Sequence, residues 1–213
     1  MWAYVTDNTI QEIIRFPKGM VINDVRHPRA IFKAWSWDEL NAVGIYTVEA
    51  GTQGDDRFEI TSSPTYAFDS TNKKVTTTYT KTDKALADSN AVDEDGNAVL
   101  DDHGNQIVNL GLKSQAKNRA RDTANGLLKR FDWIIARKVT ADTAIPSALV
   151  TYMAAVRTDY ANICTAIDDA SDMAAFKLLF ADTYKTVDGE QVVDVVARVN
   201  RWTDDYNLLQ YAR

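Results

Sequence analysis

The residues with the clearest potential for chemistry lie in one acidic segment, residues 93–108, with the sequence DEDGNAVLDDHGNQIV. It contains two eight-residue units, Asp93–Leu100 and Asp101–Val108, each with the order acidic, acidic, any residue, Gly, Asn, any residue, apolar, apolar. Carboxylate and amide oxygens at alternating positions are the ligands that a Ca²⁺ loop supplies. Two tight turns would use the same residues, because Asp initiates turns and Gly-Asn tolerates a positive φ.

The spacing favours the turns over the calcium site. An EF-hand loop has a bidentate glutamate at its twelfth position and a glycine at its sixth. Counted from Asp93, the twelfth position is Gly104, and the glycine Gly96 falls two places early. We therefore expect two turns joined by short strands at AVL and QIV, and no metal ion at Asp93, Asp95 or Asn97.

The rest of the chain offers few catalytic or cofactor-binding groups. The two histidines, His27 and His103, are far apart in the sequence, and His27 is expected in a loop because a proline follows it. The short signatures of zinc peptidases, redox dithiols, serine hydrolases and nucleotide-binding loops are missing. We predict no catalytic residue and no cofactor, although the spacing leaves open a glycosidase pair that includes Asp38 or Glu39.

Composition narrows the class of protein. The 213 residues are 45% hydrophobic, enough to bury a core, and the formal charge of −6 argues against binding to nucleic acid or a membrane surface. The single cysteine, Cys164, forbids an internal disulfide and is expected to be a buried thiol. The N-terminus shows no signal-peptide pattern, and no apolar run reaches the length of a membrane span. We expect a chain made in a reducing cytoplasm.

Residues 1–82 have the composition of strands and turns. The segments 2–5 and 10–14 flank the turn dipeptide Asp7-Asn8, which predicts an N-terminal hairpin. The other predicted elements are a helix at 37–43 capped by Ser36 and Glu39, and strands at 45–50, 58–63, 65–69 and 74–82.

The hydrophobic period changes in the second half of the chain. Apolar residues recur every three or four positions over 113–138, which predicts one long amphipathic helix. A second helix is expected from Ser147 and a third after a cap at Ser171. Asp188-Gly189 predicts a hairpin-type turn, and residues 191–199 fit either a strand or a short helix. The residues predicted to lie between the first two helices are Leu128, Phe131, Ile135, Val156 and Ile163.

These patterns predict an α+β fold in which a small antiparallel β domain precedes an antiparallel helical hairpin or bundle. The expected segments are a β-rich domain at 1–82, an acidic turn-rich arm at 83–112, a helical domain at 113–182, and a C-terminal hairpin or helix and tail at 183–213. An arm so poor in apolar residues is expected to be either mobile or ordered by a neighbouring subunit.

The segment LLKRFDWIIARKVTADTAIPSALVTYMAAVR, residues 127–157, resembles a pattern of bacteriophage tail-associated proteins. Phe131 and Met153 depart from that pattern, where threonine and arginine are usual. The N-terminal MWAYVTDNTIQEIIRFPKGM and HPRAIFKAWSWDELNAVGIYTVE resemble the opening of small proteins associated with phage tails and tail fibres. The resemblance covers about half of the chain and implies a viral tail context. The residues that carry its helical part are Leu127-Leu128, Asp132-Trp133, Arg137-Lys138, Ile145-Pro146, Tyr152 and Arg157.

Three functions are consistent with these observations. The first is a non-catalytic structural component of a virion, tail- or fibre-linked, which would act through protein–protein contacts after synthesis in the bacterial cytoplasm. The second is a tail-fibre assembly chaperone absent from the mature particle, and the third is a wall or polysaccharide hydrolase. For the first we expect other tail or fibre proteins in multiple copies as partners, and no nucleic acid, membrane or small-molecule substrate.

The expected interface residues are large aromatic side chains, one arginine and the carboxylates of the arm. Side chains of these types also pack in a protein core, and the helical spacing of Trp133 from Phe131 and Ile135 favours internal packing. Arg137, four residues after Trp133, is placed to stack on that ring. The complete set is Trp2, Tyr4, Trp35, Trp37, Asp93, Asp95, Asp101, Asp102, Trp133 and Arg137.

Overall fold

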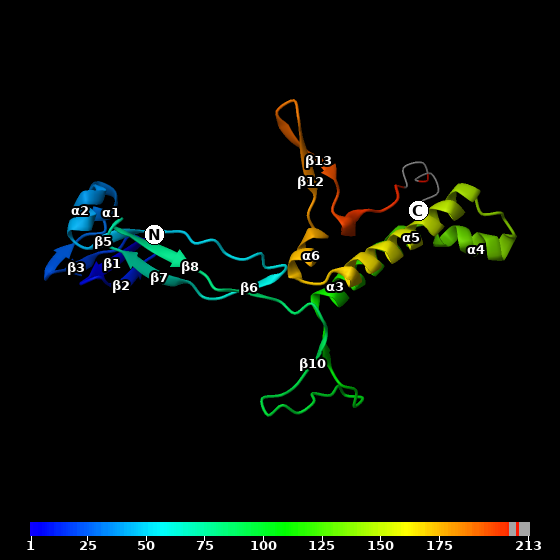
Figure 1. Cartoon of the computed structure of the whole chain (residues 1–213), viewed down its shortest axis with the longest axis horizontal. Helices are drawn as coiled ribbons and strands as arrows, with labels where there is room; N and C mark the ends of the chain where they lie inside the picture. Colours follow the sequence, from blue (N-terminus) through cyan, green and yellow to red (C-terminus); the bar gives the residue numbers. More distant parts are fainter. Residues whose placement is uncertain (205–207, 209–213) are drawn as a thin grey trace. The chain divides into compact units, whose positions relative to one another are not determined.

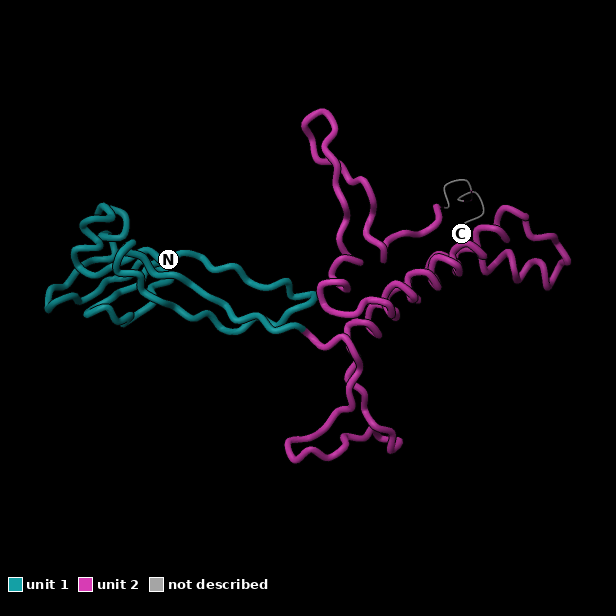
Figure 2. Tube along the Cα trace, viewed as in Figure 1, with its two compact units in different colours: residues 1–83 teal, residues 84–213 magenta. Residues whose placement is uncertain are grey.

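The computed structural model describes residues 1–204 and 208. It is mixed α+β, with 35% of residues helical and 28% in strands, so neither class dominates. The chain divides into two compact units, residues 1–83 and 84–213 (Figure 2). Most of the strands belong to the first unit and the long helices to the second (Figure 1).

The first unit begins with the predicted hairpin. Strands β1 (Trp2–Thr6) and β2 (Thr9–Ile14) pair antiparallel. Asp7 and Asn8 between them have φ angles of 52° and 59°. Both values are positive, as a two-residue type I′ turn requires, so the turn dipeptide determines this hairpin.

The main sheet contains a parallel pair that the sequence did not predict. Its strand order is β2-β1-β5-β8-β7, with β5 at Ile45–Glu49, β7 at Thr65–Asp69 and β8 at Lys74–Thr78. β8 pairs antiparallel with β7 but parallel with β5. Most strand pairs of this unit are antiparallel, as expected, and the β5–β8 pair is the exception. There the long connection after β5 brings the chain back in the same direction.

The predicted strands at 58–63 and 74–82 are also shorter than expected. Pro64 has no N–H to donate and interrupts one side of the ladder. Beyond it, β6 (Glu59–Thr61) pairs with β9 (Lys81–Asp83) in a separate two-stranded sheet.

Two short helices cover the N-terminal strands. They are α1 (Ile31–Ala34) and α2 (Trp37–Ala42), and the predicted capping box is present at Ser36 and Glu39. The Ser36 hydroxyl accepts the Glu39 N–H, and the Glu39 carboxylate accepts the Ser36 N–H at 2.7 Å. The buried residues of this core are Ile14, Met20, Ile22, Ile31, Phe32, Leu40 and Ile45.

A second hairpin in this unit corrects the expected position of His27. Strands β3 (Met20–Ile22) and β4 (Val25–His27) pair antiparallel around a turn in which Asn23 and Asp24 have positive φ. His27 ends a strand and its ring lies 5.2 Å from that of Trp35, edge to face. Asn23-Asp24 is a two-residue turn signal of the same kind as Asp7-Asn8.

In the second unit, the long predicted helix is two helices. α3 (Leu112–Lys129) ends before Phe131, and α4 (Asp132–Ala141) begins after it. Phe131 leaves the helical region with a ψ of 2° and is fully buried, with its ring 5.7 Å from that of Tyr152. The break places a large aromatic side chain between the helices, and this burial overrides the local helical pattern.

Helix α5 (Ser147–Asp169) runs antiparallel to α3. The Lys117 ammonium lies 2.8 Å from the Asp168 carboxylate near one end of the pair, and the Phe131–Tyr152 contact lies near the other. The buried side chains of α5 follow the predicted stripe: Leu149, Tyr152, Met153, Val156, Ile163 and Ile167.

Three predicted positions in this unit are wrong. Ile135 is 38% exposed, and Ile134 is buried instead at 6%, because the helix restarts after Phe131 in a new register. Cys164 is half-buried, whereas a buried thiol was expected. Leu128 is half-buried but packs against the core of this unit, as predicted. The cap of α6 (Met173–Leu178) is Asp172, whose carboxylate accepts the Ala175 N–H, and not Ser171.

The open choice near the C-terminus resolves to a strand. β12 (Thr183–Val187) and β13 (Glu190–Val195) form an antiparallel hairpin around Asp188-Gly189, and a short 3₁₀ turn follows at Arg198–Asn200. The rest of the predicted C-terminal tail, 205–207 and 209–213, lies outside the described residues. No described helix has the length and apolar character that a membrane span requires.

The register of α4 yields a matched test. Ile134→Asp should cost roughly 3–5 kcal/mol, because it places a carboxylate in the apolar core of the second unit. Ile135→Asp, one residue away, should stay within about 1 kcal/mol of the parent because Ile135 is partly in solvent. Thermal unfolding followed by circular dichroism compares the two variants. Equal losses would contradict the burial of Ile134 in preference to Ile135.

Candidate functional site

The acidic arm is the best candidate for a functional site. It leaves the start of α3 as a narrow stem in which β10 (Ser89–Asn90) pairs antiparallel with β11 (Val108–Asn109) (Figure 1). Beyond the stem, the chain makes two tight turns. Isolated bridges join Val92 to Ala98 and Leu100 to Gln106 at their bases.

Each turn is held by the aspartate that begins its eight-residue unit. The Asp93 carboxylate accepts the backbone N–H of Asp95 at 3.0 Å and of Asn97 at 2.8 Å, and the Asn97 amide donates to it at 3.3 Å. Gly96 supplies the positive φ, 83°, that the turn needs. The predicted use of this segment as turns is confirmed here.

The second eight-residue repeat, Asp101–Val108, has the same turn geometry. The Asp101 carboxylate accepts the N–H of His103 at 2.9 Å and of Asn105 at 2.8 Å, and Gly104 has a φ of 81°. Two turns with the same hydrogen-bond pattern therefore follow each other, eight residues apart.

A ring of backbone hydrogen bonds closes the arm. Ala91 N–H donates to Ile107 C=O at 2.8 Å, Ile107 N–H to Val99 C=O at 2.9 Å, and Val99 N–H to Ala91 C=O at 3.0 Å. The three residues are eight apart, so ALADSNAV, residues 85–92, is a third unit of the repeat. Sequence reasoning missed it because this unit lacks Gly-Asn and has a single acidic residue.

Gln106 lies against this ring. Its side-chain amide nitrogen is 2.7 Å from Ala91 C=O, and 3.2 Å from the carbonyls of both Val99 and Ile107. Asn90 and Ala98 occupy the equivalent position in the other two repeats. The half-buried Gln106 side chain thus contacts all three carbonyls of the ring and links the three eight-residue repeats.

The base of the arm is fixed to α3. Asp88 accepts the Gly111 N–H at 2.7 Å and the Ser114 hydroxyl at 2.9 Å. The next two N–H groups, of Leu112 and Lys113, donate to the carbonyls of Ala85 and Leu86. A helix leaves its first N–H groups without partners in the helix, and here the arm satisfies them.

The arm is therefore ordered by its own chain. The sequence had suggested a mobile segment or one ordered by a neighbouring subunit, and the hydrogen bonds above make neither necessary. Backbone groups replace the apolar core that this segment lacks.

The arm nevertheless exposes groups that its own chain does not use. Val92 is 60% exposed and Leu100 is 54% exposed. Within the described part of the chain, the carboxylates of Glu94, Asp95 and Asp102 lie in solvent without a hydrogen bond or ion pair. Among the acidic residues expected at an interface, Asp95 and Asp102 thus remain available, whereas Asp93 and Asp101 hold the turns.

The same geometry bears on the calcium alternative. Hydrogen bonds from Asn97 lower the pKa of Asp93, and those from Asn105 lower the pKa of Asp101, because the donors stabilise the charged carboxylates. Most lone pairs of these two carboxylates already accept N–H groups. In the described residues, no three His, Cys, Asp or Glu side chains gather at one point. The lack of a bound ion stays a prediction.

The aromatic residues expected at an interface have mixed positions. In the first unit, Trp2, Tyr4 and Trp35 are half-buried against the core, and Trp37 is 55% exposed on α2. In the second unit, Trp133 is half-buried against the core and Arg137 lies 5.8 Å from its ring. Trp37 is therefore the aromatic member of the set that is most available to a partner.

The candidate glycosidase residue Glu39 has a structural role. Its exposed carboxylate caps α2, and the hydrogen bond from the Ser36 N–H lowers its pKa. A catalytic acid at neutral pH needs a raised pKa, so the shift is in the wrong direction for that role.

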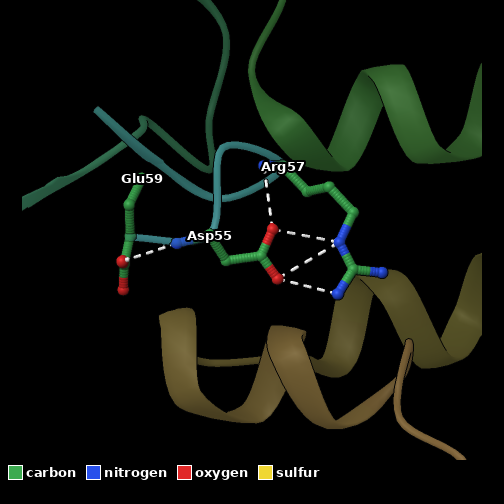
Figure 3. Close-up of polar contacts among 3 residues, drawn as sticks. All are labelled: Asp55, Arg57 and Glu59. Atoms are coloured by element: carbon green, nitrogen blue, oxygen red, sulfur yellow. Dashed lines mark hydrogen bonds and ion pairs between the residues drawn. The ribbon is translucent and has the colours of Figure 1, made fainter. Parts of the chain in front are cut away.

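A second group of charges in the first unit also serves the backbone. The Asp55 carboxylate makes a two-oxygen contact with the Arg57 guanidinium, 2.7 Å at its shortest, and also accepts the Arg57 N–H (Figure 3). The Glu59 carboxylate accepts the Asp55 N–H at 3.2 Å. The hydrogen bonds that the Arg57 guanidinium donates to the Asp55 carboxylate raise the pKa of Arg57, and the cluster fixes the loop before β6.

Two open grooves of the described residues bear on the hydrolase alternative. An open groove of about 500 Å³ in the first unit is lined by Tyr66, Tyr79 and Arg15, among others, but by no carboxylate. A groove of about 470 Å³ in the second unit includes Asp159 and Asp194, which are bonded to Thr203 and Lys185 respectively. Hydrolysis of a glycoside needs two available carboxyl groups, which neither groove provides.

The link through Gln106 can be tested by an isosteric change. Gln106→Glu replaces the amide donor with a carboxylate that faces three carbonyl oxygens, so the ring should open. The amides of Ala91, Val99 and Ile107 should exchange with deuterium at least about tenfold faster, as expected for a loss of about 1.4 kcal/mol. Gln53→Glu, an exposed position in the first unit, is the control of equal charge. Unchanged exchange in the Gln106 variant would remove this residue from the ring's support.

The turn aspartates predict a response to acid. A carboxylate whose pKa is lowered on folding stabilises the fold above its unfolded pKa of about 4, and this stabilisation is lost as pH falls through the lowered value. The amide resonances of Asn97 and Asn105 should therefore shift towards unfolded positions below about pH 4. In Asp93→Ala, the Asn97 resonance should lose this dependence and the Asn105 resonance keep it. Loss of both would mean that the turns do not act separately.

Comparison of the chain with protein-family models finds no matching family, and comparison with curated proteins and with solved structures finds no match.

Proposed function

We propose that this chain is a non-catalytic structural component of a bacteriophage virion, linked to the tail or its fibres, which acts by binding other virion proteins. The observation that carries the contact function is the arm, a self-closed β element that presents apolar side chains and unused carboxylates. The viral setting rests on the sequence resemblance of residues 127–157 and of the N-terminal segment. Under this proposal the chain occurs in several copies and needs no cofactor.

The exposed apolar groups of the arm support a binding role. Single apolar side chains are common on protein surfaces, but Val92, Leu100, Ile107, Val108 and Leu110 are all exposed within one short segment. Burial of one such side chain contributes roughly 1.5–3 kcal/mol, so several together can support a stable contact. The neighbouring carboxylates keep these groups from associating with the arms of other copies in solution.

The hairpin β12–β13 supports the same conclusion. All of its strand residues are exposed on both faces, including Tyr184, Val187 and Val193. An isolated two-stranded hairpin is marginally stable in water. Its free strand edges and apolar side chains suit a protein partner.

A fibre-assembly chaperone is the second candidate. Val139 on α4 is 80% exposed and Val150 on α5 is 53% exposed, and the two flank the loop that joins these helices. Such a helical end could hold the unfinished end of a fibre. The hydrolase is the weaker alternative, because its required pair of carboxyl groups is not found in either groove.

The proposal is tested in purified particles. Quantitative mass spectrometry should detect the chain at a fixed copy number per particle. In a variant that replaces residues 91–107 with Asn-Gly, the stem should close directly, because Asn90 and Val108 already face each other. Both units should remain folded, and incorporation should fall at least about tenfold.

The alternatives give different results. A chaperone would be needed for infectivity but missing from the particles. A hydrolase would release products from cell-wall or capsule preparations. Normal incorporation of the variant without the arm would contradict the contact role of the arm.

A further inference from the structure

The second unit separates its charges between the arm and the helices. Residues 84–111 contain six carboxylates and one lysine, a net charge of −5. Residues 112–141, which form α3 and α4, contain eight basic and two acidic residues, a net charge of +6. A chain with an overall charge of −6 thus carries a basic helical surface directly after an acidic arm.

Local ion pairs and hydrogen bonds involve some of the basic residues of α3 and α4 and some of the carboxylates of the arm, and leave other described residues of both signs without a partner. Among the basic residues, Lys117 pairs with Asp168 and Lys138 with Asp142. Within the described part of the chain, the exposed Arg119, Arg121 and Lys129 form no ion pair. α3 therefore has three available cations, and the arm has three available carboxylates, Glu94, Asp95 and Asp102.

The apolar groups match in the same way. Ile135 and Val139 are one helical turn apart on α4, and both are exposed. They lie beside Arg137 and Lys138 in the sequence, as Val92 and Leu100 lie beside carboxylates in the arm. Each surface therefore combines exposed aliphatic side chains with charges of one sign, and the two signs are opposite.

The arm is not expected to reach the Lys129 and α4 part of this surface in its own chain. Its base is fixed to the first turn of α3, whereas Lys129 and α4 lie at the other end of that helix. At 1.5 Å per residue, the two ends of α3 are roughly 25 Å apart. No ion pair of the described residues joins the lobes of the arm to α3 or α4.

The exposed area is consistent with a further contact. The chain exposes 14253 Å². Two compact units with its total mass of 23.8 kDa would expose about 12,000 Å² together even if they did not touch. The difference, about 2,000 Å², is enough for two surfaces of about 800 Å², the usual size on each side of a stable interface.

We propose that the arm of one copy binds the basic surface of α3 and α4 on a second copy of this chain. Glu94, Asp95 and Asp102 would pair with Arg119, Arg121 and Lys129, and the arm's Val92 and Leu100 would cover Ile135 and Val139. Because each copy offers a different surface at each contact, repetition gives a closed ring or a filament. The inference rests on the proposed function, since it names another copy as one of its protein partners.

The test reverses the charges on each side separately. The full chain should associate in sedimentation velocity at low salt and dissociate as salt rises, because its contacts are partly electrostatic. Glu94→Lys with Asp95→Lys and Asp102→Lys should weaken association at least about a hundredfold. Arg119→Glu with Arg121→Glu and Lys129→Glu should weaken it as much. The turn aspartates and the buried side chains are unchanged in both variants, so both should keep the parent's melting temperature.

An equimolar mixture of the two variants decides the result. The lysine-bearing arm fits the glutamate-bearing helix, and the two unaltered surfaces fit each other, so the mixture should associate again. A control with Thr6→Lys, Gln11→Lys and Thr52→Lys adds three lysines to exposed positions of the first unit and should associate as the parent does.

Three outcomes would overturn the inference. They are a parent chain that is monomeric at all salt concentrations, variants that still associate, and a mixture that remains dissociated. The second of these would indicate another joining surface, such as the β12–β13 hairpin. A monomeric chain that is still present in particles would reject this contact and leave the proposed function intact. A ring or filament absent from particles would do the reverse.

Discussion

The architecture of the second unit depends on the N-terminus of α3. Three consecutive N–H groups, from Gly111 to Lys113, donate to Asp88 and to the carbonyls of Ala85 and Leu86. The arm is thereby both the cap of the helix and an extension from it. A Cβ atom on Gly111 would lie 2.4 Å from the backbone of Ala87, so no larger residue fits this junction. The direction in which the arm leaves the helix is set by backbone contacts.

The fold of the arm is stabilised without a hydrophobic core. Its three units close through a ring of backbone hydrogen bonds, with Gln106 against the ring and a glycine at the tip of each of two turns. Because the structure needs few apolar contacts, aliphatic side chains and carboxylates are left free to face outward. A segment stabilised in this way can present a binding surface before any partner arrives, and ordering it on binding then costs little.

The sequence was most informative where local chemistry determines the backbone. Asp7-Asn8, the Ser36–Glu39 capping box and the Asp-Gly turns each specify a conformation within a few residues, and the structure follows them. It was least informative where distant contacts decide. The break at Phe131 depends on burial against Tyr152, and the parallel pairing of β5 with β8 depends on the path of the intervening chain. The two Gly-Asn turns of the arm were predicted correctly, but its closure could not be foreseen, because the first repeat, residues 85–92, lacks the glycine that marks the other two.

Charge separation gives the arm and the helices distinct roles in one chain. At physiological salt, fields between exposed charges fade over about 8 Å, so an acidic lobe far from α4 gains little from the basic residues there. The same charges become effective only when the surfaces meet and water is displaced. A fixed arm therefore favours contact with a neighbour over collapse onto its own helices. The hydrogen bonds at Gly111 and around Gln106 hold the arm in one conformation, so its free carboxylates and aliphatic side chains already face solvent when two surfaces meet.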